Sequence, residues 1–220
     1  MRDLLNIITP LHTSTKRNYL ERMNNNKVEC MEIAKKYGAE FWDGDKKYGY
    51  GGYKYDGRQE VIARKLIDKY HLKEDSKILD VGCGKGFLLH EFKKILPSGK
   101  VIGFDISDYA IKNAKEEIKE NIFVHDAKNK FPFPDKTFDL ITSITTLHNL
   151  QGRDLKKSLQ ELERVGKNKY LVVESFRNEK ELFNLQCWAL TCESFFTPEG
   201  WNWMFDEAGY RGDYEFIYFE

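Results

Sequence analysis

From residue 77 onward, short apolar runs alternate with segments in which apolar residues recur at helical spacing. The runs are KILDVG, VIGFDI, NIFVHDA, FDLITSI and KYLVVESF. Between the last two, Leu155, Leu159 and Leu162 share one face of a predicted helix. Strands that read as near-continuous apolar runs and alternate with helices form parallel sheets covered on both faces. The alternation therefore predicts an α/β fold, with a doubly wound, mostly parallel sheet of six or seven strands.

The two ends of the chain have a different character. Residues 1–76 contain no strand-like run, but they have helical stretches near 14–36 and 58–71. The segment between these stretches, KYGYGGYKYDGR at 47–58, is rich in glycine and tyrosine. After the fifth run we expect helices from about Asn178 and from Pro198, and an edge strand at 213–219. We predict an N-terminal helical lid region at 1–56 and a domain at 57–220, with substrate-side elements at 178–210.

Helix boundaries are marked by particular residue types. Ser107 and Thr197 are suitable N-caps, and Pro198 suits the first helical position. The helix after Ser107 is expected to have one apolar face, formed by Ala110, Ala114 and Ile118. Gly166 is expected to end the helix before the fifth run as a left-handed C′ residue.

The charge balance argues against several classes of protein. Lys plus Arg and Asp plus Glu both number 35, so the formal net charge is zero and there is no basic excess for nucleic acid. No apolar run is long enough for a membrane span, and the N-terminal apolar piece is too interrupted for a secretory signal. The four cysteines have no metal-site spacing. We expect a reduced, cytoplasmic protein with no metal, membrane or nucleic-acid partner.

The first apolar run ends in a glycine-rich turn, ILDVGCGKGF. A phosphate-binding loop would need Ser or Thr after Lys85, where the chain has Gly86. A dinucleotide fingerprint would need glycine where Phe87 stands. Instead, an acid precedes three alternating glycines, from Asp80 to Gly86. The glycines allow the main chain to pass close to a ligand, and the carboxylate suits an ammonium or sulfonium group better than a pyrophosphate.

Two further acids end the next two predicted strands. Asp105 follows the glycines by about 20 residues, where a carboxylate can accept hydrogen bonds from both hydroxyls of a ribose. Asp126 ends the third run and can accept from an exocyclic amine of adenine, and Ile106 offers an apolar surface to the ring. Because ligands of doubly wound sheets bind at the carboxyl ends of the strands, these groups are expected to meet.

The motifs ILDVGCGKG, VIGFDIS, VHDA and FDLITSITTLHNL resemble those of class I S-adenosylmethionine-dependent methyltransferases, which have a Rossmann-like sheet. The resemblance covers residues 57–210 and does not identify an acceptor. It implies that the glycines line the methionyl part of the cofactor and that Thr145 offers a backbone acceptor to its amine. The implied cofactor-binding residues are Asp80, Gly82, Gly84, Gly86, Asp105, Ile106, Asp126, Ala127 and Thr145. Members of the family usually end in an antiparallel hairpin, and only one final strand is evident here.

Methyl transfer from a sulfonium needs alignment of the acceptor, and it needs a base only if the acceptor arrives protonated. His148, after the fourth run, is a candidate base, with pocket shaping as the alternative role. Glu174, at the end of the fifth run, is a second candidate, which could bind a cationic acceptor or cap the next segment. His148 and Glu174 are therefore the predicted catalytic residues.

The acceptor pocket is expected to come from the two ends of the chain. Its predicted lining residues are Tyr48, Tyr50, Tyr53 and Trp188; packing on neighbouring helices is the alternative role. Trp201 and Trp203 are two residues apart on a predicted helix and cannot share a face, so at least one is expected to serve a pocket or interface. We predict transfer to a small molecule. The alternatives are a methyltransferase acting on a protein or RNA, and a catalytically silent cofactor-binding partner subunit.

Overall fold

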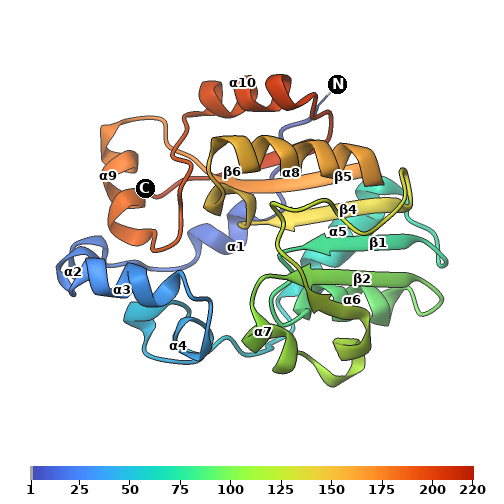
Figure 1. The fold of residues 1–220 in the computed structure, drawn as a ribbon, viewed down its shortest axis with the longest axis horizontal. Helices are drawn as coiled ribbons and strands as arrows, with labels where there is room; N and C mark the ends of the chain where they lie inside the picture. Colours follow the sequence, from blue (N-terminus) through green and yellow to red (C-terminus); the bar gives the residue numbers. More distant parts are fainter. Residues whose placement is uncertain (1) are drawn as a thin grey trace.

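The computed structural model describes residues 2–220, which form an open six-stranded sheet (Figure 1). All neighbouring strands pair in parallel, in the order β3-β2-β1-β4-β5-β6. The strands are β1 (Lys77–Val81), β2 (Lys100–Asp105), β3 (Ile122–Val124), β4 (Phe138–Ile144), β5 (Gly166–Glu174) and β6 (Asp213–Ile217). The predicted doubly wound, Rossmann-like sheet is confirmed.

Helices cover both faces of the sheet, and each face has its own apolar core. Alternate strand residues explain the division: Ile78 and Val172 face α5 and α6, whereas Leu79 and Leu171 face α8 and α10. The helices around the sheet are α5 (Gln59–Tyr70), α6 (Phe87–Ile95), α7 (Asp108–Lys112), α8 (Gly152–Val165) and α10 (Pro198–Ala208), whereas α9 (Glu179–Trp188) packs against the N-terminal region. Short 3₁₀ turns are η1 (Lys46–Tyr48), η2 (Glu116–Asn121) and η3 (Leu147–Asn149).

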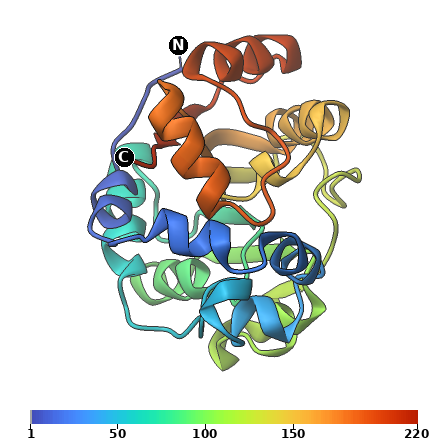
Figure 2. The ribbon, with the colours of Figure 1, turned by 90° about the vertical axis from the view of Figure 1, so that its left-hand side faces the viewer.

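The N-terminal region contains four short helices. They are α1 (Thr9–Thr13), α2 (Tyr19–Asn24), α3 (Lys27–Ala34) and α4 (Ala39–Trp42). The predicted helical stretch at 14–36 is broken between α2 and α3, where Asn26 adopts a left-handed conformation with φ 48°. Figure 2, which views the side that is on the left in Figure 1, shows these helices and α9 lying across the molecule in front of the sheet. None of the helices within residues 2–220 is long and apolar enough to cross a membrane.

The sheet ends at β6, and the N-terminal segment lies along the outer edge of that strand. The amide N–H of Leu5 donates to the carbonyl of Tyr214 (2.8 Å), and the amide of Tyr214 donates to the carbonyl of Asp3 (3.0 Å). Leu4 forms an isolated parallel bridge with Tyr214. Backbone groups that would otherwise be unpaired on the edge strand are therefore partly satisfied by the start of the chain.

Two predicted helix boundaries are corrected. The helix after Ser107 ends at Lys112, because the amide of Lys115 turns away to bond the carbonyl of Lys85 (3.2 Å). Gly166 is not a left-handed C′ residue: its φ is −107° and ψ is 144°, so the chain passes from α8 directly into β5. A Cβ at Gly166 would lie 2.6 Å from the Cδ1 of Ile141, so close packing explains the glycine. The predicted N-caps Ser107 and Thr197 both accept a backbone N–H bond and are confirmed.

Candidate functional site: the carboxyl edge of strands β1, β2, β4 and β5

The glycine turn between β1 and α6 requires glycine for steric reasons. Gly82, Gly84 and Gly86 all have positive φ, at 78°, 55° and 72°. A Cβ at Gly82 would lie 2.1 Å from the Oγ1 of Thr146, beyond the end of β4. The turn thus brings bare backbone against the neighbouring strand end, as the sequence predicts for a ligand-binding turn.

Asp105 is anchored by the glycine turn and by its own loop. Its carboxylate accepts the amide N–H of Gly84 (2.9 Å) on one oxygen and that of Ser107 (2.8 Å) on the other. Burial raises the pKa of Asp105, which is 8% exposed, while these backbone bonds favour its ionised form. The two oxygens are held side by side, and each retains capacity to accept a further hydrogen bond. This arrangement fits the two hydroxyls of a ribose.

Asp80 lies inside the same edge, on β1. Its Oδ1 accepts the hydroxyl of Thr142 on β4 (2.7 Å). Burial raises the pKa of Asp80 to about 7, against the opposing effect of that hydrogen bond. With a pKa near neutral pH, the carboxyl of Asp80 can hold a proton in the free protein. A cationic ligand bound beside it would favour the ionised form.

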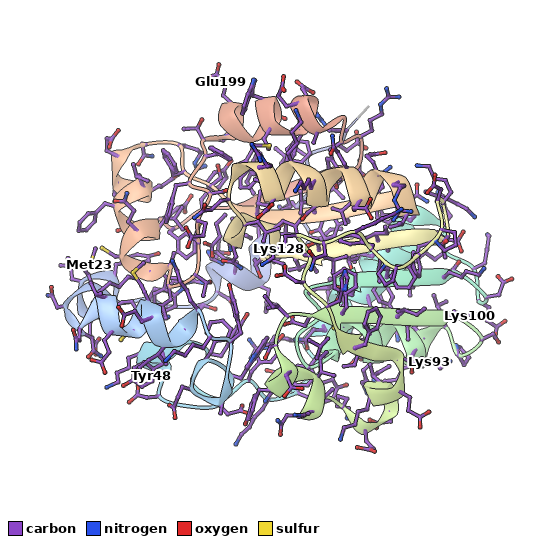
Figure 3. All side chains as sticks on the ribbon, in the orientation of Figure 1. Met23, Tyr48, Lys93, Lys100, Lys128 and Glu199 are labelled. Carbon is purple, nitrogen blue, oxygen red and sulfur yellow. The ribbon has the colours of Figure 1, made fainter. Side chains whose placement is uncertain are left out.

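The predicted adenine side lies beside the ends of β2 and β3. Ile106 is 48% exposed, so an apolar surface is available next to Asp105. The Asp126 carboxylate is engaged by its neighbour Lys128, whose amide donates at 3.0 Å and whose Nζ lies at 2.8 Å (Figure 3). Ala127 follows, and its carbonyl accepts the Ser158 hydroxyl (2.7 Å). Asp126 can still accept from a ligand amine, in competition with Lys128.

Two buried polar atoms at this edge have no hydrogen-bond partner within residues 2–220: the Nε2 of His125 and the Oδ1 of Asn149. His125 follows β3, and Asn149 ends the η3 turn after β4. An unsatisfied buried polar atom is costly, and it is uncommon in folded proteins without a ligand or water. Both atoms, together with the free capacity of Asp105, fit a polar ligand along the carboxyl edge.

Backbone strain marks the end of β4. Thr145 has φ 51°, although a β-branched residue is strongly disfavoured in the left-handed region. Its amide donates to the carbonyl of Val172 on β5 (2.9 Å), which holds the strained turn in place. Strain of this kind is concentrated at functional sites. The predicted cofactor residues of β1, β2 and β4 therefore meet at one edge of the sheet.

His148 and Glu174 form a contacting pair at the ends of β4 and β5. The Nδ1 of His148 accepts the backbone N–H of Glu174 (3.3 Å), which places the proton of the neutral ring on Nε2. That Nε2 faces the Glu174 carboxylate at 3.5 Å. Burial lowers the pKa of His148, although Glu174 opposes this, so the ring is neutral at neutral pH. His148 thus lies against Glu174, whose side chain is 15% exposed and has a free carboxylate oxygen for a ligand.

The lid segment, defined here as residues 37–55, packs its aromatic rings onto the glycine turn. Tyr50 stacks on Trp42 with a centroid distance of 5.2 Å, and Tyr53 stacks on Phe87 at 4.9 Å. Burial raises the pKa of Tyr53 to about 12, and the charge of Asp80 adds to this effect. Tyr53 therefore lies within electrostatic reach of the cofactor-side acid.

Tyr50 belongs to the aromatic cluster of the lid segment. Besides its stacking on Trp42, its ring lies 5.3 Å from that of Phe41 and 4.5 Å from that of Tyr53. Burial of the hydroxyl raises the pKa of Tyr50. The residue is nevertheless 47% exposed, so the structure places Tyr50 at the open side of this cluster.

The structure places Tyr48 elsewhere. It packs against the small cluster of Cys30, Ala34 and Leu190, and Figure 3 shows it on the N-terminal helices. The ring of Tyr48 is also covered by the Nζ of Lys47 (4.7 Å). Tyr48 therefore packs on the N-terminal helices, which is the alternative role predicted for the tyrosines of the glycine- and tyrosine-rich loop.

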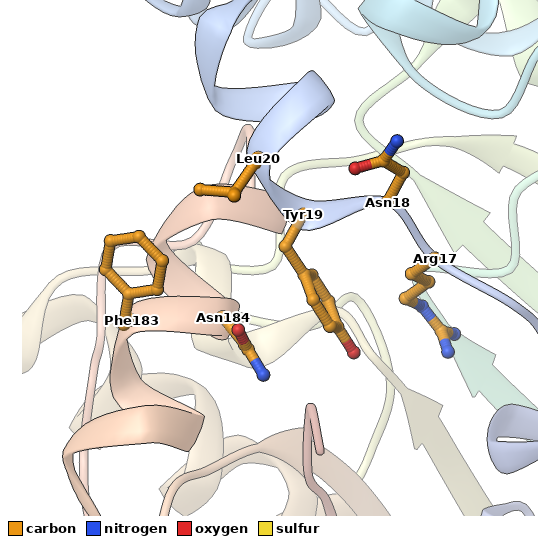
Figure 4. A pocket seen from close by; sticks show the side chains of 6 residues that line it. All are labelled: Arg17, Asn18, Tyr19, Leu20, Phe183 and Asn184. Atoms are coloured by element: carbon orange, nitrogen blue, oxygen red, sulfur yellow. The ribbon is translucent and has the colours of Figure 1, made fainter.

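Trp188, at the end of α9, is bracketed by the guanidinium groups of Arg17 (5.3 Å) and Arg22 (4.6 Å). Next to it, between α2 and α9, lies a cavity of about 410 Å³ (Figure 4). Its lining residues are Arg17, Asn18, Tyr19, Leu20, Phe183 and Asn184, none of which is a predicted site residue. Of the other aromatic residues, Trp201 is fully buried and its Nε1 donates to the carbonyl of Glu174 (3.0 Å), whereas Trp203 is 58% exposed.

Sequence reasoning missed two residues of this site. Trp42 covers Gly84, and Lys85 is only 5% exposed although it belongs to the glycine turn. Both interact with partners distant in sequence, so no local spacing indicates them. The one available signal for Lys85 was its position inside the motif.

Comparison with known proteins agrees with this geometry. The model of the methyltransferase-domain family matches residues 72–209, which is more than half of the chain. The fold resembles the YcgJ protein of Bacillus subtilis, with a TM-score of 0.54 and 22% identity over 66% of each chain. A methyltransferase of Bacillus halodurans, described as putative in that structure, gives a TM-score of 0.54 and 24% identity over 67% of this chain and 68% of that one. These two likenesses concern the fold alone.

Curated relatives are similar over part of their length. The ubiquinone/menaquinone biosynthesis C-methyltransferase UbiE of Cronobacter sakazakii is 34% identical over 54% of this chain and 50% of its own. The mitochondrial arginine-hydroxylase NDUFAF5 of Rattus norvegicus is 30% identical over 61% of this chain and 39% of its own. The chain thus spans half or less of the length of these relatives, and their names describe different reactions.

The sheet, the glycine turn and the paired acids define a class of protein. This chain belongs to the methyltransferase-domain family. Among residues 2–220, no three His, Cys, Asp or Glu side chains gather as metal ligands would.

Proposed function

We propose that the protein transfers the methyl group of S-adenosylmethionine to a small-molecule acceptor, with residues 1–56 acting as a lid region over the domain at 57–220. The observation that carries this proposal is that the lid segment covers the glycine turn: the indole of Trp42 lies on the backbone of Gly84, and the Nζ of Lys85 binds both carboxylate oxygens of Asp43. A covered edge suits a small acceptor, because a macromolecule would need an open surface there. The zero net charge also favours a small molecule over nucleic acid.

In this proposal the residues of β1, β2 and β4 bind the cofactor, which supplies an activated methyl group on a sulfonium. Asp80 faces its amino group, Asp105 holds its ribose and Ile106 packs on its adenine. The strained turn at Thr145 presents backbone to the methionyl end. These residues bind and orient, and they take no proton.

The proposal assigns proton transfer to Glu174. Glu174 would accept the proton of an acceptor hydroxyl or ammonium next to its carboxylate, and the cofactor would supply the activated methyl group. The Nε2 of His148 faces this carboxylate at 3.5 Å, and the Nε1 of Trp201 donates to the backbone carbonyl of Glu174 (3.0 Å). His148 is therefore a positioning residue, which refines its predicted role as a base.

The test is a screen for S-adenosylhomocysteine formation with phenols, quinols, amines and carboxylates, alongside unfolded protein and RNA. We expect turnover with a small molecule only. Glu174→Gln should lower kcat by about 10²- to 10⁴-fold, as for loss of a general base. His148→Gln, which keeps an N–H donor, should lower kcat less than His148→Ala.

Other outcomes would contradict the proposal. Turnover confined to protein or RNA would overturn the small-molecule acceptor. A pH–rate profile whose acid limb near the histidine pKa disappears in His148→Gln would instead make His148 the base.

A further inference from the structure

Trp42 connects the lid segment to the glycine turn and to the loop after β2. Its Nε1 donates to the Oγ of Ser107 (2.8 Å) and to the carbonyl of Tyr37 (3.1 Å). A Cβ at Gly84 would lie 2.8 Å from the Cη2 of Trp42, so the indole lies directly on the glycine backbone. The indole is 5% exposed and is fixed by contacts on two sides.

Two of the residues that Trp42 contacts, Gly84 and Ser107, also hold Asp105. The amide of Gly84 donates to one oxygen of the Asp105 carboxylate and the amide of Ser107 to the other. Movement of the indole would therefore release both neighbours of the predicted ribose-binding acid. Gly84 and Ser107 therefore support both the position of the lid segment and the geometry of the Asp105 carboxylate.

A buried ion pair provides a second attachment. The Nζ of Lys85 donates to both carboxylate oxygens of Asp43 (2.8 and 2.7 Å) and to the carbonyl of Tyr53 (3.0 Å). All three ammonium donors are thus used on the lid segment. The hydroxyl of Tyr109 also donates to Asp43 (2.9 Å). A buried ammonium is stable only with such partners, so the burial of Lys85 depends on the closed position of the lid segment.

We propose that Trp42 is a positioning residue of the cofactor site and that closure of residues 37–55 is linked to binding of the adenosyl ligand. This inference rests on the cofactor of the proposed function. A ligand that needs Asp105 in this geometry binds the closed form preferentially and shifts the population towards it. A change that loosens the lid segment therefore weakens ligand binding to the extent that it lowers the closed population.

Hydrogen exchange of the full chain, with and without S-adenosylhomocysteine, tests the linkage directly. We expect amides of residues 37–55 to exchange at least tenfold more slowly with ligand. Calorimetry should show the dissociation constant rising at least tenfold in Trp42→Ala and less in Trp42→Phe, which keeps a ring but loses the N–H donor. The control Trp203→Ala, at an exposed tryptophan on α10, should bind within twofold of the unaltered protein.

Asp43→Asn is a second variant for the case in which Trp42→Ala fails to fold, since Asp43 is partly exposed (31%) and lies outside the core. It should speed exchange of the lid segment and raise the dissociation constant, both in the direction seen for Trp42→Ala. If the ligand binds the unaltered protein without slowing exchange at 37–55, and Trp42→Phe and Asp43→Asn bind normally, the inference is wrong and the cofactor assignment stands. If the ligand does not bind the unaltered protein, both fail.

Discussion

At the scale of single residues, the site is built from buried acids and from glycines that no other residue can replace. Asp80 is 5% exposed and Asp105 is 8% exposed, and each is supported by donors from another strand or turn. The sequence predicted the positions of these two acids, because each follows directly on an apolar run and the first also precedes the three glycines. Trp42 and Lys85 were not predicted, because their partners are distant in the chain.

The raised pKa of Asp80 leads to a pH prediction. Burial favours its protonated form, with a pKa of about 7 against an ordinary value of 3.8. Between these two values the folded protein holds a proton that the unfolded chain releases, so the contribution of Asp80 to the free energy of unfolding falls as pH rises from about 4 to 7. Asp80→Asn removes this effect.

The contribution of Asp80 to the free energy of unfolding is measured by urea unfolding of the ligand-free protein between pH 4 and 7. The free energy of unfolding of Asp80→Asn, relative to the unaltered protein, should increase with pH by up to about 1.4 kcal/mol per pH unit. Parallel curves for the two proteins would show that Asp80 is ionised throughout, and would contradict the prediction.

Glycine substitutions separate backbone strain from steric fit. Gly82 and Gly209 have similar φ values of 78° and 68°, but a Cβ at Gly209 meets nothing within 4 Å. Gly209→Ala should therefore cost only the left-handed backbone penalty, about 1–2 kcal/mol. Gly82→Ala should cost more in denaturant unfolding and should also weaken ligand binding, because its Cβ would displace Thr146. Equal costs for both variants would contradict the packing described here.

At the scale of elements, the edge of the sheet differs from the hairpin usual in the family. The Glu215 side chain, on β6 and 1% exposed, accepts the amides of Ile7 (2.7 Å) and Ile8 (2.9 Å), which ties the N-terminal segment to the last strand. The hydroxyl of Tyr170 also donates to it. The start of the chain thus occupies the edge where a further strand would otherwise lie.

Glu215→Gln tests the importance of this attachment. The amide side chain cannot accept on both of its polar atoms, so at least one buried donor loses its partner. We expect a loss of about 2–4 kcal/mol in urea unfolding, since hydrogen bonds to charged groups contribute about 1.5–3 kcal/mol each. The surface variant Glu207→Gln, which removes an exposed contact to Lys156, should change stability by less than about 0.5 kcal/mol. A Glu215→Gln protein as stable as this control would show that the N-terminal segment is held by other contacts.

Element types were easier to predict than their ends. The strands were predictable because each is a buried apolar run, and the N-caps Ser107 and Thr197 because capping is local chemistry. The break between α2 and α3 and the early end of α7 were not predictable. The bond from Lys115 to Lys85 joins residues far apart in the chain, and Asn26 is one of three consecutive asparagines, any of which could adopt the left-handed conformation.

At the scale of the whole molecule, the proposed cofactor side and the proposed acceptor side come from different segments of the chain. In the proposed function the cofactor side is formed by the sheet, which the family model covers. The proposed acceptor side is formed by the N-terminal helices and α9, and residues 2–71 lie outside that match. Relatives named for quinone methylation and for arginine hydroxylation share the first part. The acceptor therefore has to be sought in the lid segment, Glu174 and Trp188.

The most direct test of the central claim is calorimetric titration of S-adenosylhomocysteine, with NAD as the comparison ligand. The account predicts one ligand bound per chain, binding at least tenfold weaker in Asp105→Ala, and unchanged binding in Asp108→Ala, a nearby exposed acid paired with Lys112. NAD should not bind. Binding of NAD, or tight S-adenosylhomocysteine binding that survives Asp105→Ala, would contradict the assignment of this edge of the sheet as the cofactor site.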